Sequence, residues 1–213
     1  MLQQTVRIVK VISWNLLRRV GASVQDVALL ISREQPDLLL MQEATRDVDE
    51  LPARIGGHYA RTPLPANSHG LAVWSRSPIS FRVMDLPPGT LIRRVCQIVD
   101  LGDFAVANVH LSHGQVLNRR QLRRIARVLP PRAAILGDFN LVGPALLAGF
   151  RDVGPRQPTH IMGDIVPIRI DRCLARDITC TRARALSRET SDHSPILVDL
   201  DIAAAGVALA AAA

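Results

Sequence analysis

The chain has 213 residues and a formal net charge of +7, and 48% of its residues are hydrophobic. This composition argues against a disordered chain, and without a linker or a low-complexity block it predicts one domain over residues 1–213. No internal stretch is long and apolar enough to span a bilayer. Gln3, Gln4 and Thr5 stand where a signal peptide would carry an apolar run. We therefore expect a cytoplasmic protein without a transmembrane segment, and a monomer.

The positive charge comes almost entirely from arginine, since Lys10 is the only lysine. Guanidinium groups bind phosphate oxygens in a bidentate way, so this charge suits a polyanionic partner such as nucleic acid or an anionic membrane surface. A genome of high GC content, which encodes arginine more often than lysine, explains the same bias. Cys96, Cys173 and Cys180 form no CxxC pair, which argues against a zinc site or a disulfide framework and indicates a reducing compartment.

Hydrophobic periodicity predicts a strand, a helix and a second strand at the start of the chain. Residues 6–13 alternate at period two, as a half-buried strand does. Ser23 is a favourable N-cap, and the apolar residues after it recur at helical spacing up to about Glu34. Pro36 ends the helix, and residues 37–42 form a short apolar run that predicts a buried strand.

The rest of the chain alternates between further strands and one more helix. Residues 71–75 and 80–85 bracket the turn sequence Arg76-Ser77-Pro78 and predict a β-hairpin. A second pair of strands is predicted around Gly102, at residues 94–99 and 104–110. A basic helix follows at about residues 115–129, and the remaining strands are predicted at residues 133–137, 168–174 and 196–201. This mixed order predicts an α/β sandwich, with two sheets face to face and helices outside. The alanine-rich tail, residues 203–213, is expected to fray.

Polar side chains recur at or near the ends of these strands, where ligand sites of open sheets form. They are Asn15, Glu43, His110, Asp138, Asn140, Asp171, Asp192 and His193. Taken singly, most have an ordinary structural explanation, such as an Asx turn or a rim histidine. Asp171 differs, because a carboxylate between Ile170 and Arg172 in a buried strand needs a partner such as a histidine.

Together these residues form the segments SWN, QE, NVHL, GDFN, RID and SDH, in that order. This set resembles the endonuclease/exonuclease/phosphatase superfamily, whose fold is that of deoxyribonuclease I. The resemblance extends from Ser13 to Pro195, and GDFN followed by SDHSPI is its most specific part. It implies a four-layer α/β sandwich and a divalent metal, usually Mg²⁺ with Mn²⁺ as a substitute, in a cleft at the edges of the two sheets.

The resemblance also implies a role for each motif residue. Asn15 and Glu43 are expected at the metal, with Glu43 as the principal direct ligand and Asp192 as a further carboxylate on the metal side.

The reacting groups are implied in the same way. Asp138 and Asn140 are expected to orient the attacking water and to hold a phosphate oxygen. Asp171 is expected to pair with His193, and His110 to be the second histidine facing the phosphate. Which histidine serves the nucleophile stays open.

The choice of substrate stays open as well. Tyr59 is the only tyrosine and aromatic residues make up 3% of the chain, which argues against an abasic-site endonuclease and against base stacking. Nucleic acid is one candidate substrate class. An anionic phospholipid or another small phosphoester is the other. A non-catalytic anion-binding module is the third alternative. Arg119, Arg123 and His113 are candidate substrate contacts, although the arginines also suit a solvated helix face.

Overall fold

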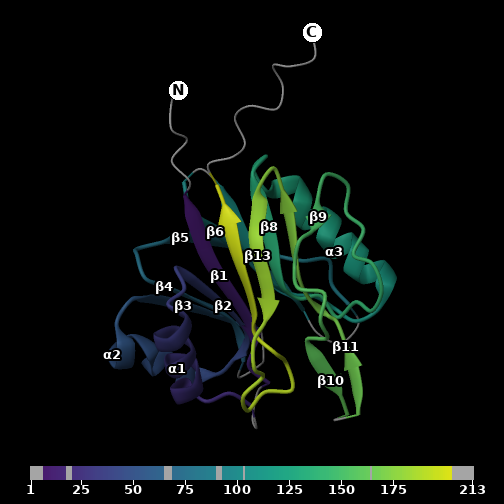
Figure 1. The fold of residues 1–213 in the computed structure, drawn as a ribbon. Coiled ribbons are helices and arrows are strands. Elements are labelled where there is room, and N and C mark those ends of the chain that lie inside the picture. The colour runs from purple at the N-terminus through teal and green to yellow at the C-terminus, as the bar shows by residue number, and fades with distance from the viewer. Residues whose placement is uncertain are drawn as a thin grey trace.

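The computed structural model describes residues 7–17, 21–64, 69–89, 93–102, 104–163 and 165–202. Two six-stranded sheets form in this part of the chain (Figure 1). The first sheet has, in spatial order, β13 (Thr179–Ala185), β14 (Ile196–Asp201), β1 (Ile8–Asn15), β2 (Leu38–Ala44), β4 (Gly70–Ser75) and β3 (His58–Pro63). The second has β5 (Ser80–Asp85), β6 (Val95–Asp100), β7 (Ala105–His110), β8 (Ala133–Asp138), β12 (Asp171–Arg176) and β9 (Arg151–Asp152).

Shorter elements complete the fold. A small antiparallel hairpin is made by β10 (His160–Met162) and β11 (Val166–Ile168). The helices are α1 (Val24–Glu34), a 3₁₀ helix at Arg46–Glu50, α2 (Leu51–Ile55) and α3 (Gln115–Val128). In the described ranges, no helix has the length and apolar character needed to cross a membrane.

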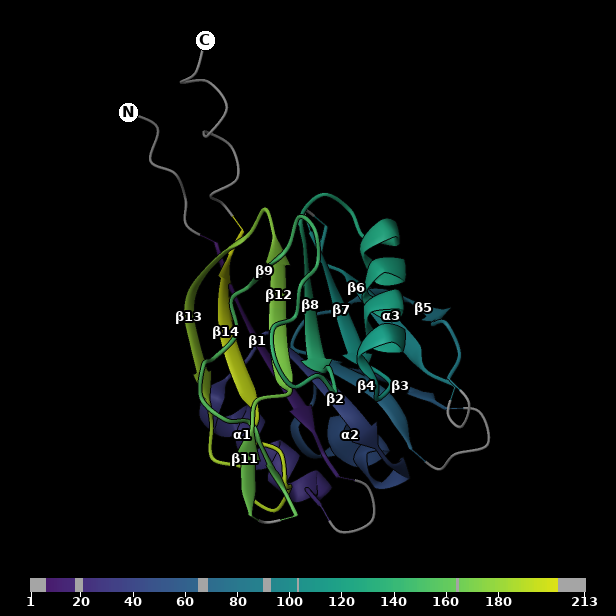
Figure 2. The ribbon, with the colours of Figure 1, turned by 90° about the vertical axis from the view of Figure 1, so that its right-hand side faces the viewer.

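Three hydrophobic clusters show that the fold has four layers. One lies between the sheets, where Val11 and Leu40 of the first sheet share a cluster with Val106 and Leu136 of the second. Another joins α1 to the outer face of the first sheet, and the third joins α3 to the outer face of the second. Figure 2 shows α3 lying outside the second sheet. The predicted four-layer α/β sandwich is confirmed.

The predicted first helix has the expected ends. The Ser23 hydroxyl accepts from the Asp26 backbone N–H, and the Asp26 carboxylate accepts from the Ser23 backbone N–H, which is a capping box. Gln35 adopts the left-handed conformation with φ of 50°, and Pro36 follows it. The helix therefore ends where the sequence predicts.

The predicted hairpin of residues 71–75 and 80–85 is wrong. β4 pairs with β2 and β3 in the first sheet, whereas β5 pairs with β6 in the second. The reason lies in burial, since every residue of β4 is buried whereas most of β5 is exposed. A strand buried on both faces needs a neighbour on each side, so the turn at Arg76-Ser77-Pro78 carries the chain from one sheet to the other.

Other boundaries differ less. The strand predicted at residues 168–174 is two strands, because the chain leaves β11 at Ile168 and enters β12 at Asp171. The first strand begins two residues later than predicted, at Ile8. The tail predicted to fray, residues 203–213, lies outside the described residues. The pair around Gly102, the basic helix and the last strand form as predicted.

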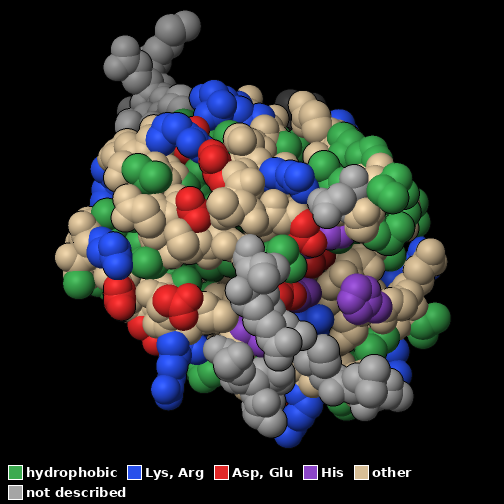
Figure 3. Space-filling model, turned by 90° about the horizontal axis from the view of Figure 1, so that it is seen from below, with side chains coloured by type: hydrophobic (Ala, Val, Ile, Leu, Met, Phe, Trp, Pro, Cys, Tyr) green, Lys and Arg blue, Asp and Glu red, His purple; other side chains and the backbone are tan. Residues whose placement is uncertain are grey.

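The topology brings the ends of the central strands together. β1 runs parallel to β2, and β7 runs parallel to β8, so in each sheet two central strands end at the same edge. The antiparallel strand β12 begins where β8 ends. Figure 3 views this edge from below and shows acidic and histidine side chains close together. A site at this edge can thus draw on both sheets.

Candidate active site

Three predicted site residues form a row across the second sheet. His110 on β7 is the register partner of Asp138 on β8, and Asp138 is the register partner of Asp171 on β12. Register partners on neighbouring strands point to the same face of a sheet. All three side chains are buried, with exposed fractions of 6%, 2% and 1%. The row exists because each motif residue stands at the last or the first position of its strand.

The Asp138 carboxylate is the centre of the site. Its Oδ2 accepts a hydrogen bond from Asn15 Nδ2 at 3.1 Å and lies 3.3 Å from His110 Nε2 and 3.9 Å from His193 Nε2. Its Oδ1 accepts from the backbone N–H of Asn140 at 2.8 Å. Asn15 lies in the first sheet, so the Asp138 carboxylate connects groups from both sheets. The spacing of the motifs in the sequence could not show this contact.

Asp171 and His193 form the predicted dyad, with His193 Nδ1 2.8 Å from Asp171 Oδ2. Thr159 fixes the carboxylate end, because its hydroxyl accepts from the backbone N–H groups of Ile170 and Asp171. The histidine end is fixed by Trp14, whose indole N–H donates to the His193 carbonyl oxygen at 3.0 Å. The dyad is therefore held from both ends and leaves His193 Nε2 facing Asp138.

Two site residues have strained backbones. Glu43 has φ of 56°, in the left-handed region that β-strand residues avoid, and Asn140 has φ of 47°, after the end of β8. Glu43 lies where the β2–β4 register shifts between Met41 and Ala44, which is a β-bulge. Bulges next to sites re-aim a side chain, and such strain persists where the surroundings impose it.

Burial and charge separate the pKa values of the site groups. Burial raises the pKa of Asp138 to about 6, although nearby His193 favours its charged form. Burial opposes the charged form of His193, but the Asp171 carboxylate outweighs this effect and raises its pKa to about 10. Burial, reinforced by the Arg94 cation, lowers the pKa of His110 well below 6.5. Near neutral pH, His193 therefore carries a charge and His110 does not.

The expected metal ligands lie on either side of this centre. Glu43 Oε1 is 4.0 Å from His110 Nδ1, and Asp192 Oδ1 is 3.9 Å from His193 Nε2. The Asn15 amide oxygen accepts one hydrogen bond, from the Leu17 N–H at 3.1 Å, and keeps a second lone pair. Partly exposed carboxylates and an amide oxygen are hard donors of the kind that Mg²⁺ binds. The donor set therefore fits this ion.

Several residues within or beside the sequence motifs support Glu43, a role that the motifs alone did not assign to them. Its neighbour Gln42 is fully buried and donates to Asn108 Oδ1 at 2.8 Å and to Ser13 Oγ at 3.0 Å. His69 and Arg94, both buried, line a narrow crevice together with Glu43 and His110. His69 was expected only at the rim of the cleft, and Arg94 was not expected at the site, because a polar residue at the start of an apolar run carries no periodic signal of its own.

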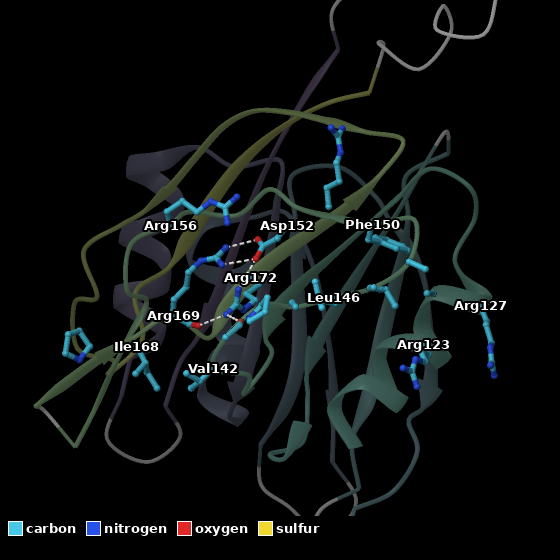
Figure 4. Close-up of a pocket in the computed structure, with 18 residues that line it drawn as sticks. Arg123, Arg127, Val142, Leu146, Phe150, Asp152, Arg156, Ile168, Arg169 and Arg172 are labelled. Atoms are coloured by element: carbon cyan, nitrogen blue, oxygen red, sulfur yellow. Dashed lines mark hydrogen bonds and ion pairs between the residues drawn. The ribbon is translucent and has the colours of Figure 1, made fainter. Parts of the chain in front are cut away.

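The candidate substrate contacts follow His110 in the chain, in the turn after β7 and on α3. His113 is exposed in the turn after β7 and Arg119 is half-buried on α3. Arg123 lines a separate open hollow of about 1250 Å³ between α3 and the segment of residues 142–152 (Figure 4). Leu146 also lines it and is 69% exposed. Arg123 thus faces a surface beside the site, and its contact with substrate stays a prediction.

An ion-pair cluster forms one wall of this hollow. Asp152 accepts hydrogen bonds from Arg169 at 2.7 and 2.8 Å and from Arg172 at 2.9 Å (Figure 4). Burial opposes the charge of Asp152, but the two guanidinium groups hold its pKa below 3.8. Its stabilising effect is therefore present above about pH 4 and is lost as the pH falls through the lowered pKa.

We expect Asp152→Asn to lower the free energy of unfolding by about 2 kcal/mol at neutral pH, because charge-assisted hydrogen bonds become neutral ones. The difference from the wild type should shrink as the pH falls from about 5 to about 2, where the wild-type carboxylate is protonated too. Thermal unfolding across this range measures the difference. A difference independent of pH would contradict this explanation.

The family match of the sequence places this chain among hydrolases of the phosphoesterase class. The sequence model of the Endonuclease/Exonuclease/phosphatase family matches residues 12–193, and the chain belongs to this family. A search of curated proteins returned no match.

Solved structures share the fold. The crystal structure of an endonuclease/exonuclease/phosphatase from Beutenbergia cavernae DSM 12333 is 21% identical, with a TM-score of 0.73 over 95% of this chain and 73% of that one. The D. rerio TDP2 structure, complexed with single strand DNA product, is 18% identical, with a TM-score of 0.74 over 91% of this chain and 99% of that one. A protein described as functionally unknown and conserved, from Enterococcus faecalis V583, is 19% identical, with a TM-score of 0.73 over 90% of this chain and 98% of that one.

Proposed function

We propose that this protein is a Mg²⁺-dependent phosphodiesterase that cleaves phosphodiester bonds of nucleic acid. The observation that carries the proposal is the convergence on Asp138 of Asn15 from one sheet and of His110 and His193 from elsewhere in the chain. Such a set can bind a phosphate, activate water and protonate a leaving group. The family to which the chain belongs supports the phosphoesterase class.

Glu43, Asn15 and Asp192 would hold the Mg²⁺ ion, since they offer hard oxygen donors at the site. When bound, the ion supplies positive charge that neutralises phosphoryl oxygens and a departing alkoxide.

The chain's own groups divide the proton transfers between them. His193, charged through Asp171, donates from Nε2 to a phosphate oxygen or to the leaving oxygen. Asp138, whose pKa lies near neutrality, accepts a proton from the attacking water. Asn140 holds Asp138 through its backbone N–H, and its own side chain donates to the Leu111 carbonyl oxygen. His110 is neutral, so it contributes a hydrogen-bond donor to the site and no positive charge.

The substrate class rests on two further observations. The D. rerio TDP2 structure holds a single strand DNA product, which favours nucleic acid. A phospholipid or another small phosphoester is the second candidate, because Met162, Ile165 and Val166 are exposed on or beside the β10–β11 hairpin that borders the site. Exposed apolar side chains of this kind suit an interface with lipid.

A substrate panel tests the proposal. Single-stranded and plasmid DNA, RNA, phospholipid vesicles and bis(p-nitrophenyl) phosphate are each incubated with the protein and Mg²⁺, Mn²⁺ or EDTA. We expect Mg²⁺-dependent release from DNA or RNA and from the chromogenic diester. Cleavage of lipid without cleavage of nucleic acid would establish the second candidate, and no cleavage of any substrate would favour the anion-binding module.

The pH profile tests the role of the dyad. With the pKa of His193 at about 10, the rate should hold up to roughly that pH. Asp171→Asn removes the carboxylate that favours the charged ring, so the folded-state pKa of His193 falls. We expect the alkaline limb of kcat to move down by at least about one pH unit. An alkaline limb at the same pH in the wild type and the variant would assign it to another group.

Cys96, Cys173 and Cys180 are free thiols, and free thiols are typical of proteins in a reducing compartment. We propose a cytoplasmic location on this ground, and the monomeric state stays a prediction that light scattering can test.

A further inference from the structure

A third histidine stands against the catalytic dyad. His160 begins β10 and forms an isolated bridge with His193, and the centroids of the two rings are 4.3 Å apart with the rings tilted by 36°. The bridge is fixed by the backbone, since Ser194 N–H donates to the Thr159 carbonyl oxygen at 2.7 Å. The same short segment thus holds Asp171 through Thr159 and places an imidazole beside His193.

Asp192 completes a three-residue cluster with the two histidines. His160 Nδ1 lies 3.6 Å from Asp192 Oδ2, and His193 Nε2 lies 3.9 Å from Asp192 Oδ1. His160 Nδ1 and Asp192 Oδ1 are both buried and have no hydrogen-bond partner among the residues that the structure describes. Orphaned buried polar atoms are costly, and an ion that binds them removes the cost.

The separations in this cluster suit a metal of small radius. One ligand atom from each of the three residues lies within 4.8 Å of the other two. Bonds of roughly 2.0–2.1 Å to one tetrahedral ion place its ligands about 3.4 Å apart. The two measured contacts, which involve different oxygens of Asp192, exceed that value by about half an ångström or less. The three side chains must therefore draw together by side-chain rotation to bind one ion.

The surroundings of His193 also match a metal-binding histidine. A histidine that binds a metal through one ring nitrogen donates its other N–H to a carboxylate, which fixes its tautomer. In this structure His193 Nδ1 already lies 2.8 Å from the Asp171 carboxylate, and His193 Nε2 faces Asp192 and Asp138. Two imidazoles and one carboxylate favour zinc and related transition metals, whereas Mg²⁺ prefers oxygen ligands.

We propose that His160, Asp192 and His193 form a second cation site, which shares Asp192 with the proposed Mg²⁺ site. This site takes Zn²⁺ or a similar transition metal, and its occupancy inhibits the enzyme by engaging His193. Binding displaces the Nε2 proton of His193 to solvent and leaves that nitrogen unable to donate to the phosphate. The inhibition rests on the proposed phosphodiesterase function, whereas the metal site does not.

Direct metal binding tests the site without any substrate. Zn²⁺ is titrated calorimetrically into the full chain with and without Mg²⁺, and Co²⁺ is used as a spectroscopic probe of coordination. His160→Phe keeps a ring against His193 but removes the ligand. His58→Gln removes an exposed histidine on β3 and is the matched control.

We expect His160→Phe to weaken Zn²⁺ binding at least about tenfold and to abolish the visible bands of tetrahedral Co²⁺. His58→Gln and Glu43→Gln should bind both ions as the wild type does. Wild-type affinity in His160→Phe, or an equal loss in His58→Gln, would overturn the proposal.

A second measurement covers the inhibition. Micromolar Zn²⁺ should reduce the Mg²⁺-supported hydrolysis of bis(p-nitrophenyl) phosphate by the wild type. The His160→Phe variant, compared with its own rate without Zn²⁺, should require a Zn²⁺ concentration at least about tenfold higher for the same inhibition. Equal inhibition of both proteins would reject the regulatory role. If no hydrolysis is found in any protein, the proposed function fails, while the calorimetric result still decides the site.

Discussion

Glu43→Gln should reduce the hydrolysis rate at least about 100-fold while the protein stays folded. Glu43 is a partly exposed carboxylate held on a β-bulge with its backbone in the left-handed region, so its position is imposed by the fold. Glutamine keeps the size of the side chain but removes the charge that neutralises a divalent cation. The measurement is the initial rate on bis(p-nitrophenyl) phosphate at several Mg²⁺ concentrations, with circular dichroism to confirm folding.

His193→Ala, assayed alongside, should lose a similar factor for a different reason, since the variant lacks the cation that Asp171 stabilises. Added Mg²⁺ should partly restore Glu43→Gln and should not restore His193→Ala. Glu50→Gln is the matched control, because Glu50 is exposed and pairs only at the surface with Arg54. If His193→Ala turned over substrate as fast as the wild type, the assignment of the dyad would be refuted.

Asn108→Ala should cost about 3 kcal/mol of unfolding free energy or more, the largest stability effect we expect from a single polar side chain. Asn108 is fully buried on β7, and its Nδ2 lies 3.2 Å from the Met41 carbonyl oxygen and 3.0 Å from the Ala72 carbonyl oxygen. Both acceptors belong to the first sheet, so this amide links the two sheets. Truncation leaves those groups, and the amide of Gln42, short of a partner inside the core.

Urea unfolding measures this cost, and a double-mutant cycle identifies its source. Gln97 Oε1 lies 2.9 Å from Asn108 Nδ2, so Asn108→Ala and Gln97→Ala should be coupled by about 1 kcal/mol. Gln157→Ala is the surface control, since Gln157 is exposed in the loop before β10. A loss below about 1 kcal/mol for Asn108→Ala would mean that water or a shifted side chain satisfies the exposed partners.

Local patterns predicted much of the fold because local physical chemistry determines them. Ser23 caps α1 through a contact three residues away, and the apolar run at residues 133–137 needs only its own burial to be a strand. The hairpin of residues 71–75 and 80–85 failed for the opposite reason. A turn sequence limits where the chain reverses but not which sheet receives the next strand, and that choice depends on partners distant in the sequence.

The candidate site divides in the same way. By themselves, the motif residues determined which chemical groups the site contains: carboxylates, amides and two histidines at strand ends. Their order along the chain resembles one family and thereby predicted the fold. Only the tertiary structure decided that Asp138 meets Asn15 across the two sheets, that Asn108 and Gln42 support Glu43, and that His160 stacks on His193. These contacts join residues up to 123 positions apart, and such pairs are set by sheet register and layer packing, which no local pattern encodes.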